Sequence, residues 1–207
     1  THPNNGWLNL AGNEYVTASK SSVFDFGTGS ISFDMWIKGD GNPSADTFPL
    51  YIGTSATGRI SIYTGTSGSM ELALDEGTQE VKCETSATDW NDGDWHYLAC
   101  VVNRDNATPF LQVFQDDKLV AQENDFGSFT SVMTLDCSNG DVVIGLHGES
   151  DTPKYNGAVD EVRIYNRVLV DVVDGGLASP SDTKNLTVST TGEILKNYKH
   201  GKGKHKN

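Results

Sequence analysis

The sequence has few basic residues and no long apolar stretch. Lysine and arginine together number 15, against 28 aspartates and glutamates, which gives a formal net charge of −13 at pH 7. Contact with the phosphate backbone of nucleic acids needs a positive surface, so this balance argues against a general nucleic-acid binder. No apolar run approaches the roughly 18 residues that a membrane-spanning helix requires. We therefore expect neither nucleic-acid binding nor membrane insertion.

Cysteine is also scarce. Cys83, Cys100 and Cys137 are the only cysteines, and none of them has Cys-x-x-Cys spacing, which argues against zinc and thioredoxin-type sites. Cys100 lies in an apolar segment and is expected to fill core space. Cys83 and Cys137 could form a disulfide, and the sequence leaves this open. The sequons at Asn106 and Asn185 leave glycosylation and the cellular compartment equally open.

Proline is rare and glycine is frequent, as in a folded domain with many turns. The chain has 207 residues with 6 prolines, 22 glycines and 36% hydrophobic residues. This length fits one large β domain that can bury a full core. The chain begins at Thr1 rather than at a methionine, and we interpret it as a processed chain or an excised fragment.

The hydrophobic pattern has a period of two, which is typical of strands that are buried on one face. In residues 31–38, Ile31, Phe33, Met35 and Ile37 share one face, and polar residues and Trp36 share the other. Asp116 and Asp117 lie between two such segments and predict a tight hairpin turn. The other predicted strands cover residues 59–63, 70–74, 95–103, 110–114, 118–122, 141–146 and 159–165. We expect Ile31, Phe33, Leu98, Val113, Val162 and Ile164 in the core of an all-β fold.

The C-terminal part of the chain differs from the rest. Residues 174–191 favour a long loop, and residues 192–198 favour one or two helical turns. Five lysines and one glutamate fall in residues 193–207, which leaves the other 192 residues with 10 basic and 27 acidic side chains, a net charge of −17. We predict a β-sandwich domain over residues 1–170. Residues 171–207 are predicted to form a loop, a short helical turn and a basic tail that pack on the sandwich or on a neighbouring subunit.

Three segments together resemble the laminin-G-like, concanavalin-A-like jelly-roll family. They are GSISFDMWIKGDG at 29–41, DGDWHYLACVVNRDN at 92–106 and YNGAVDEVRIYNRVL at 155–169, and LNLAGNEYV at 8–16 fits the opening strand and turn. The resemblance implies an all-β fold, a two-sheet antiparallel jelly-roll sandwich. The ending GEILKNYKHGKGKHK at 192–206 is similar to that of laminin-G-like domains in structural proteins of marine bacteriophages.

The sequence does not carry the acidic motif of related sandwich glycanases. Those enzymes use a Glu-x-Asp-x-x-Glu strand, and retaining hydrolysis needs two carboxyl groups roughly 5 Å apart. Here Glu71 and Asp75 are separated by four positions, and the five histidines form no recognisable triad with a serine. We therefore expect a protein that is not an enzyme.

Asp160 is the candidate calcium ligand. Strict alternation over residues 159–165 places it on the apolar face with Val162 and Ile164, where a carboxylate must be neutralised, hydrogen-bonded or bound to a cation. In similar sandwiches the matching aspartate binds a structural calcium together with backbone carbonyls, which would fall near Asn5 and Asn13. The alternative is that Asp160 caps backbone amides at the start of the strand.

Aromatic residues in turn-rich segments are the candidate sugar platforms, since sugar rings stack on aromatic faces. Trp90 and Tyr155 are the two candidates, and Asp92, Asp151 and Asn156 could add hydrogen bonds. The alternative for Trp90, which we favour, is that it covers an edge of the sandwich.

Two functions remain compatible with the sequence. The first is a non-catalytic extracellular or virion-surface structural protein with a lectin-like fold, which self-associates as a decoration or fibre subunit. Its basic tail, with Lys199, Lys202, Lys204 and Lys206, would contact the acidic body of a neighbouring subunit. The alternative is a carbohydrate-binding module that attaches its parent particle or cell to surface glycans. Fold alone does not choose between them, and we favour the first.

Overall fold

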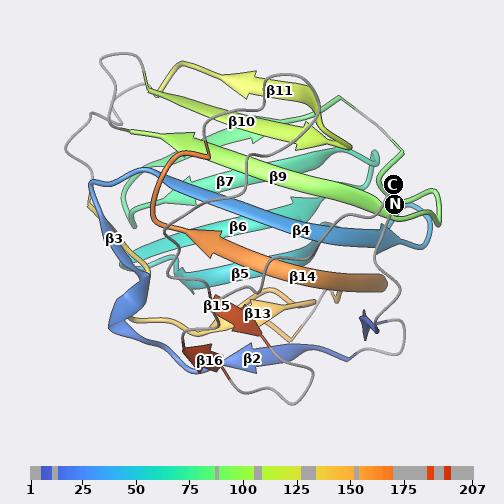
Figure 1. Cartoon of the computed structure of the whole chain (residues 1–207), viewed down its shortest axis with the longest axis horizontal. Helices are drawn as coiled ribbons and strands as arrows, with labels where there is room; N and C mark the ends of the chain where they lie inside the picture. The colour runs from blue at the N-terminus through green and yellow to red at the C-terminus, as the bar shows by residue number, and fades with distance from the viewer. Residues whose placement is uncertain are drawn as a thin grey trace, which may run out of the picture.

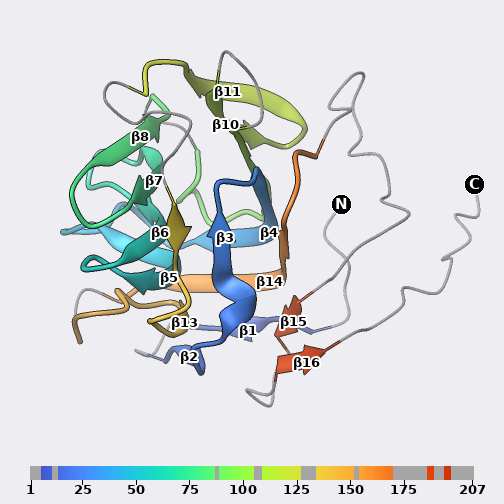
Figure 2. The same cartoon turned by 90° about the vertical axis from the view of Figure 1, so that its left-hand side faces the viewer.

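The computed structural model is an antiparallel sandwich of two six-stranded sheets, the front sheet and the back sheet in the view of Figure 1. The structure describes residues 6–10, 14–86, 89–104, 109–126, 134–151 and 154–169, and the backbone of strands 186–188 and 194–196. Figure 2 shows the two layers side by side, with β3 crossing one end of the sandwich. The predicted all-β jelly-roll sandwich is confirmed.

The strands of each sheet come from distant parts of the chain. The front sheet has the order β1 (Leu8–Asn9), β14 (Gly157–Tyr165), β4 (Ile31–Gly39), β9 (His96–Asn103), β10 (Phe110–Gln115) and β11 (Lys118–Glu123). The back sheet has the order β2 (Val16–Ala18), β13 (Val142–Ile144), β5 (Thr47–Thr54), β6 (Gly58–Thr64), β7 (Met70–Asp75) and β8 (Glu80–Glu84). A short pair joins β3 (Asp25–Gly27), which directly follows the 3-10 turn η1 (Ser22–Phe24), with β12 (Leu135–Asp136). The non-sequential order brings loops that are far apart in sequence to the same end of the sandwich.

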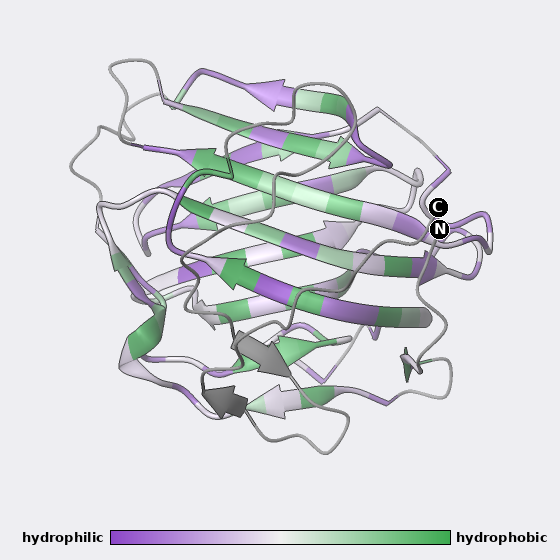
Figure 3. Ribbon diagram, in the orientation of Figure 1, coloured by the Kyte–Doolittle hydropathy of each residue, from purple (hydrophilic) through white to green (hydrophobic). Residues whose placement is uncertain are grey.

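The core lies between the inner faces of the two sheets. Ile31, Phe33, Leu98, Val113, Val162 and Ile164 are all buried in one hydrophobic cluster, as predicted. Figure 3 shows hydrophobic and hydrophilic residues alternating along the strands of the front sheet. Burial of apolar surface contributes about 25 cal/mol per Å². This alternation therefore fixes which face of each strand points inward.

The hairpin between β10 and β11 turns at Asp116 and Asp117, as predicted. Both residues have positive φ, 49° and 66°, in the left-handed region where aspartate is tolerated better than most residues. Two consecutive positive φ angles are the requirement of a type I′ turn, whose twist matches that of the flanking strands. The turn also places the Asp116 carboxylate at one end of the front sheet.

Asp160 does not lie on the apolar face, so the alternation that placed it there is wrong. The register between β14 and β4 pairs Asp160 with Trp36 and then Arg163 with Asp34, so a bulge covers the two intervening residues. Glu161 takes a φ of 51° within the bulge. The extra residue shifts the pattern, so that Val159 and Val162 point inward and Asp160 shares the outer face with Trp36.

Two further expectations concern the cysteines and the C-terminal segment. All three cysteines are free and buried, so Cys83 and Cys137 are not paired. The predicted helical turn over 192–198 is wrong, because β16 (Ile194–Lys196) pairs as a strand with β15 (Leu186–Val188). A weak seven-residue helical pattern does not reveal that a partner strand is available a few residues earlier.

Candidate functional site

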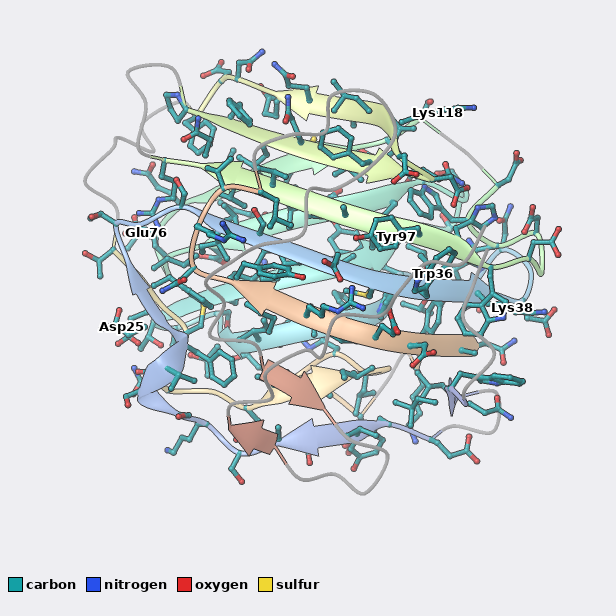
Figure 4. All side chains as sticks on the ribbon, in the orientation of Figure 1. Asp25, Trp36, Lys38, Glu76, Tyr97 and Lys118 are labelled. Carbon is teal, nitrogen blue, oxygen red and sulfur yellow. The ribbon has the colours of Figure 1, made fainter. Side chains whose placement is uncertain are left out.

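Three loop segments meet at the end of the sandwich opposite β3, near Lys38 in Figure 4. They are residues 40–47 after β4, residues 89–93 before β9, and residues 154–156 before β14. Backbone hydrogen bonds join them: Gly41 N donates to Asn91 O at 2.9 Å, and Asp40 N donates to Asn156 O at 3.2 Å. The site is therefore held by main-chain contacts between segments that are distant in the sequence.

Gly39 and Gly157 let these segments approach each other. The two glycines are directly paired across β4 and β14. A Cβ on Gly39 would lie 2.1 Å from Asn91 Oδ1 and 2.9 Å from the Trp90 carbonyl oxygen. A Cβ on Gly157 would lie 2.0 Å from the Lys38 carbonyl oxygen. Since neither position has room for a side chain, glycine at both is what allows the loops to close over the strand ends.

The three segments enclose a pocket of about 260 Å³, which we call the end pocket. The polar residues that line it are Asp40, Asn42, Asn91, Lys154, Tyr155 and Asn156. Asn91 and Tyr155 are buried, and neither the Asn91 Nδ2 atom nor the Tyr155 hydroxyl has a hydrogen-bond partner. Burial also raises the pKa of Tyr155, so its hydroxyl keeps its proton. Two residues of the end-pocket lining thus carry buried polar atoms without partners.

The structure brings together most of the predicted sugar-binding residues. Tyr155 and Asn156 line the end pocket, and Asp92 is bridged to Asp40 at its edge. Trp90 lies behind the pocket and is 0% exposed, while Tyr155 is 1% exposed. The exposed ring face that sugar stacking requires is therefore absent at both residues, and Trp90 packs in the core. Asn91 was not predicted, because an asparagine in a turn-rich segment carries no signal of burial.

His96 fastens the 89–93 segment to the neighbouring hairpin. Its Nδ1 lies 2.8 Å from Asp116 Oδ2, and its Nε2 lies 3.2 Å from Asp92 Oδ1. Burial alone would lower the pKa of His96, but the hydrogen bonds to Asp116 and Asp92 outweigh burial and raise it. The ring can donate to both carboxylates when it is protonated, and its two contacts hold the residues next to Asn91 in place.

A second depression, the side groove, lies over the outer face of β2 and β13 and measures about 430 Å³. Asp151, Glu149, His147 and the half-exposed Tyr15 line it. Glu149 accepts a hydrogen bond from the Tyr51 hydroxyl at 2.6 Å. Burial opposes ionisation of Glu149, but the hydrogen bonds from Tyr51 and Ser55 prevail and lower its pKa. Asp151 thus belongs to a different depression from Tyr155 and Asn156.

The two acidic side chains of strand β7, Glu71 and Asp75, are paired with residues of neighbouring strands. Glu71 is hydrogen-bonded by the Tyr63 hydroxyl and lies 3.0 Å from Lys82 Nζ. Asp75 Oδ2 lies 3.3 Å from Arg59 Nε. Glu71 and Asp75 share a face but are four residues apart on an extended strand, a separation of roughly 13 Å. That distance exceeds the spacing of either glycosidase mechanism.

The predicted calcium ligands are only partly described. Asp160 is half-buried, and its Oδ1 accepts a hydrogen bond from Glu161 N at 2.8 Å, so the capping interaction is present. Asn5 and Asn13 lie outside the described residues. Leu8 pairs with Val159, so the N-terminal strand runs beside Asp160. Within the described ranges, no group of three or more His, Cys, Asp or Glu could hold a metal ion.

The tail lysines Lys199, Lys202, Lys204 and Lys206 also lie outside the described residues. In the part of the chain that the structure covers, no helix has the length and apolar character needed to cross a membrane.

The sequence and the fold identify the family. A laminin G-type model, described as the concanavalin A-like lectin/glucanases superfamily, matches residues 10–171. The chain belongs to the concanavalin A-like superfamily. A search of curated proteins found no match.

Solved structures of the concanavalin A-like type share the architecture. The CBM40 domain of Ruminococcus gnavus IT-sialidase bound to alpha2,3 sialyllactose is 14% identical, with a TM-score of 0.57 over 79% of this chain and 96% of that one. A heptameric SAP-like pentraxin from Limulus polyphemus is 12% identical, with a TM-score of 0.54 over 84% and 80%. The binding domain of botulinum neurotoxin DC in complex with SialylT is 12% identical, with a TM-score of 0.55 over 76% of this chain and 37% of that one. At these identities, the likeness establishes the fold.

Proposed function

We propose that this chain is a non-catalytic glycan-binding module and that the end pocket is its binding site. The observation that carries the proposal is the pair of buried, unpartnered groups on Asn91 and Tyr155, two residues of the pocket lining. A buried polar group without a partner costs about 1–3 kcal/mol. A ligand that supplies both partners removes this cost on binding, which gives the pocket a preference for a hydroxyl-rich molecule.

The size and lining of the end pocket suit one sugar ring. Ligand pockets start at about 300 Å³, and the volume of about 260 Å³ lies near that lower limit. Sugar hydroxyls both donate and accept, and the pocket offers amide, hydroxyl and carboxylate groups for both directions. The fold neighbours crystallised with sialyllactose and SialylT support a glycan ligand as a class.

Tyr155→Phe tests the proposal, because it removes only the hydroxyl. Since this hydroxyl has no partner, the free energy of unfolding should stay the same or rise, by up to about 1 kcal/mol. Glycan affinity should fall about threefold to tenfold, the value of one neutral hydrogen bond. A glycan array would identify the ligand, and titration calorimetry with thermal melting would measure both effects.

Tyr165→Phe is the matched control for this substitution. Its hydroxyl donates to Asp34 Oδ2 at 2.7 Å on the outer face of the front sheet, away from the end pocket. This variant should lose stability and keep glycan affinity. If Tyr155→Phe binds glycans as tightly as the unmodified protein does, the end pocket is not the binding site.

The structural-subunit function stays a prediction that rests on the sequence. Its motive is the charge difference between a body of net charge −17 and a C-terminal segment with five lysines. The two roles are compatible, because a virion-surface or other extracellular subunit can carry a glycan pocket. For either role we propose a location outside the cell or on a virion surface.

We also propose that Asp160 supplies one oxygen to a structural calcium ion, together with backbone carbonyls near Asn5 and Asn13. Calcium takes six to eight oxygen ligands and would tie the N-terminal segment to β14. Removal of calcium with a chelator should then lower the melting temperature by several degrees, a loss of about 1–3 kcal/mol.

The calcium proposal is checked by comparing two variants in the same melting experiment. Asp160→Ala should melt lower than the unmodified protein and should no longer respond to chelator. Asp25→Ala removes an exposed carboxylate at the other end of the sandwich and should leave the chelator response unchanged. An unmodified protein that melts at the same temperature with and without chelator leaves Asp160 only its capping role.

A further inference from the structure

We infer that the end pocket selects neutral glycans and discriminates against sialylated ones. This inference rests on the proposed function and adds the ligand class to it. The neighbours crystallised with sialyllactose and SialylT share the fold at 14% and 12% identity, so their ligands do not fix the charge of the ligand here. The charge of the pocket and the positions of the arginines argue for a neutral sugar.

No arginine lines either depression in the described part of the chain. Arginine is the residue best suited to a carboxylate, because its guanidinium forms two parallel hydrogen bonds. The sequence contains four arginines, Arg59, Arg104, Arg163 and Arg167, and all four are described. A sialic acid carboxylate in the end pocket would therefore lack this partner.

Three of the four arginines are held elsewhere by contacts of their own. Arg163 lies 2.9 Å from Asp34, and Arg59 pairs with Asp75 and Glu80. Arg104 donates to the Gly27 carbonyl oxygen at 3.0 Å. Arg167 follows the far end of β14, roughly 30 Å along the strand from Gly157 at the pocket. Arg59, Arg104 and Arg163 would have to break these contacts to move, and Arg167 is separated from the end pocket by the length of β14.

The one cationic side chain that lines the end pocket, Lys154, already contacts an aromatic ring. The half-buried Lys154 has its ammonium 5.6 Å above the ring centre of Tyr15, on the side groove. Asp40 lines the pocket, and the exposed Asp92 is paired with it through the backbone at the pocket edge, so an entering ligand meets a carboxylate in the lining and a second one nearby. A negatively charged ligand is repelled by these carboxylates, and the overall net charge of −13 adds to the repulsion.

The same groups suit the hydroxyls of a neutral sugar. The Asp40 carboxylate accepts from hydroxyl donors, and a carboxylate accepting from two neighbouring hydroxyls forms charge-assisted hydrogen bonds. Asn91 Nδ2 donates, and the Tyr155 hydroxyl can donate or accept. A neutral hexose or acetamido sugar meets all three groups without adding a charge.

Matched glycan pairs test the inference. The full-length protein is titrated with neutral glycans and their sialylated counterparts, lactose against 3′-sialyllactose among them, at low and high salt. The neutral member should bind at least tenfold more tightly, about 1.4 kcal/mol, with little change as salt rises. Binding of the sialylated member should improve with salt, because screening weakens its repulsion from Asp40 and Asp92.

Two variants separate the inference from the proposed function. Asp40→Asn should reduce the preference for the neutral glycan, because it weakens binding of the neutral glycan and strengthens binding of the sialylated one. Asp25→Asn neutralises an exposed carboxylate at the other end of the sandwich and should leave the preference unchanged. A sialylated glycan that binds as tightly as its neutral counterpart overturns the inference and leaves the glycan-binding function standing. If neither member of any glycan pair binds, both the proposed function and the inference are overturned.

Discussion

Trp90→Ala is expected to lower the free energy of unfolding by about 3–5 kcal/mol, the cost of removing a large aromatic side chain from a packed core. Trp90 is the largest of the fully buried side chains, and it packs edge-on against His96 at 6.0 Å between ring centres. Its loss leaves a cavity directly behind Asn91 and the end pocket. Chemical denaturation monitored by circular dichroism measures the effect.

The same substitution separates a core role for Trp90 from a stacking role. Trp90→Phe keeps most of the packing volume and should keep glycan binding, since no ring face of Trp90 is exposed. Trp36→Ala is the control, because Trp36 is half-buried on the outer face of β4 and should cost clearly less stability. A Trp90→Ala protein that is fully stable but no longer binds glycan would show that the indole contacts the sugar.

The period-two pattern predicted the fold because burial on one face is a local property of each strand. Ile31 and Phe33 point inward in β4 for the same reason that Val113 does in β10, and no knowledge of the partner strand is needed. The pattern did not reveal β5 or β8. Five consecutive residues of β5 are buried, so this strand does not alternate, and β8 is a short edge strand.

The candidate site was only partly predictable, because burial there depends on segments that are distant in sequence. Trp90 and Tyr155 lie among polar turn residues, which suggested exposed rings. In the structure the three loop segments close over the strand ends and bury both. The signal that could have revealed this closure is the pair Gly39 and Gly157, since a glycine at each strand end is typical of close backbone approach.

The bulge in β14 shows why strict alternation of side chains predicts the wrong face for a residue when one strand carries an extra residue. The sequence from Val159 to Tyr165 reads as a regular strand, and only the register with β4 shows two residues opposite one. The shift moves Asp160 from the apolar face to the outer face. It also leaves Arg163 directly opposite Asp34, which creates a partly buried ion pair in the front sheet.

Asp34→Ala should lower the free energy of unfolding by about 3–5 kcal/mol, because it breaks this ion pair and leaves its partners behind. Asp34 is 2% exposed, with Arg163 Nη1 at 2.9 Å and the Tyr165 hydroxyl at 2.7 Å. Without the carboxylate, a largely buried guanidinium keeps only Glu161 as an acidic partner, and the Tyr165 hydroxyl loses its hydrogen bond to Asp34. Urea denaturation of the variant against the unmodified protein measures the loss.

The size of this loss depends on the unpaired charge left on Arg163 rather than on the strength of the ion pair itself. A double substitution separates these two contributions. Replacing both partners, Asp34→Leu with Arg163→Met, removes the charges together and should recover most of the lost stability. Asp46→Ala removes an exposed carboxylate and should change stability by no more than about 0.5 kcal/mol. If Asp34→Ala costs no more than Asp46→Ala, the pair contributes nothing. If the double variant is as unstable as Asp34→Ala, the loss comes from packing on the outer face of β4 and β14 rather than from an unpaired Arg163.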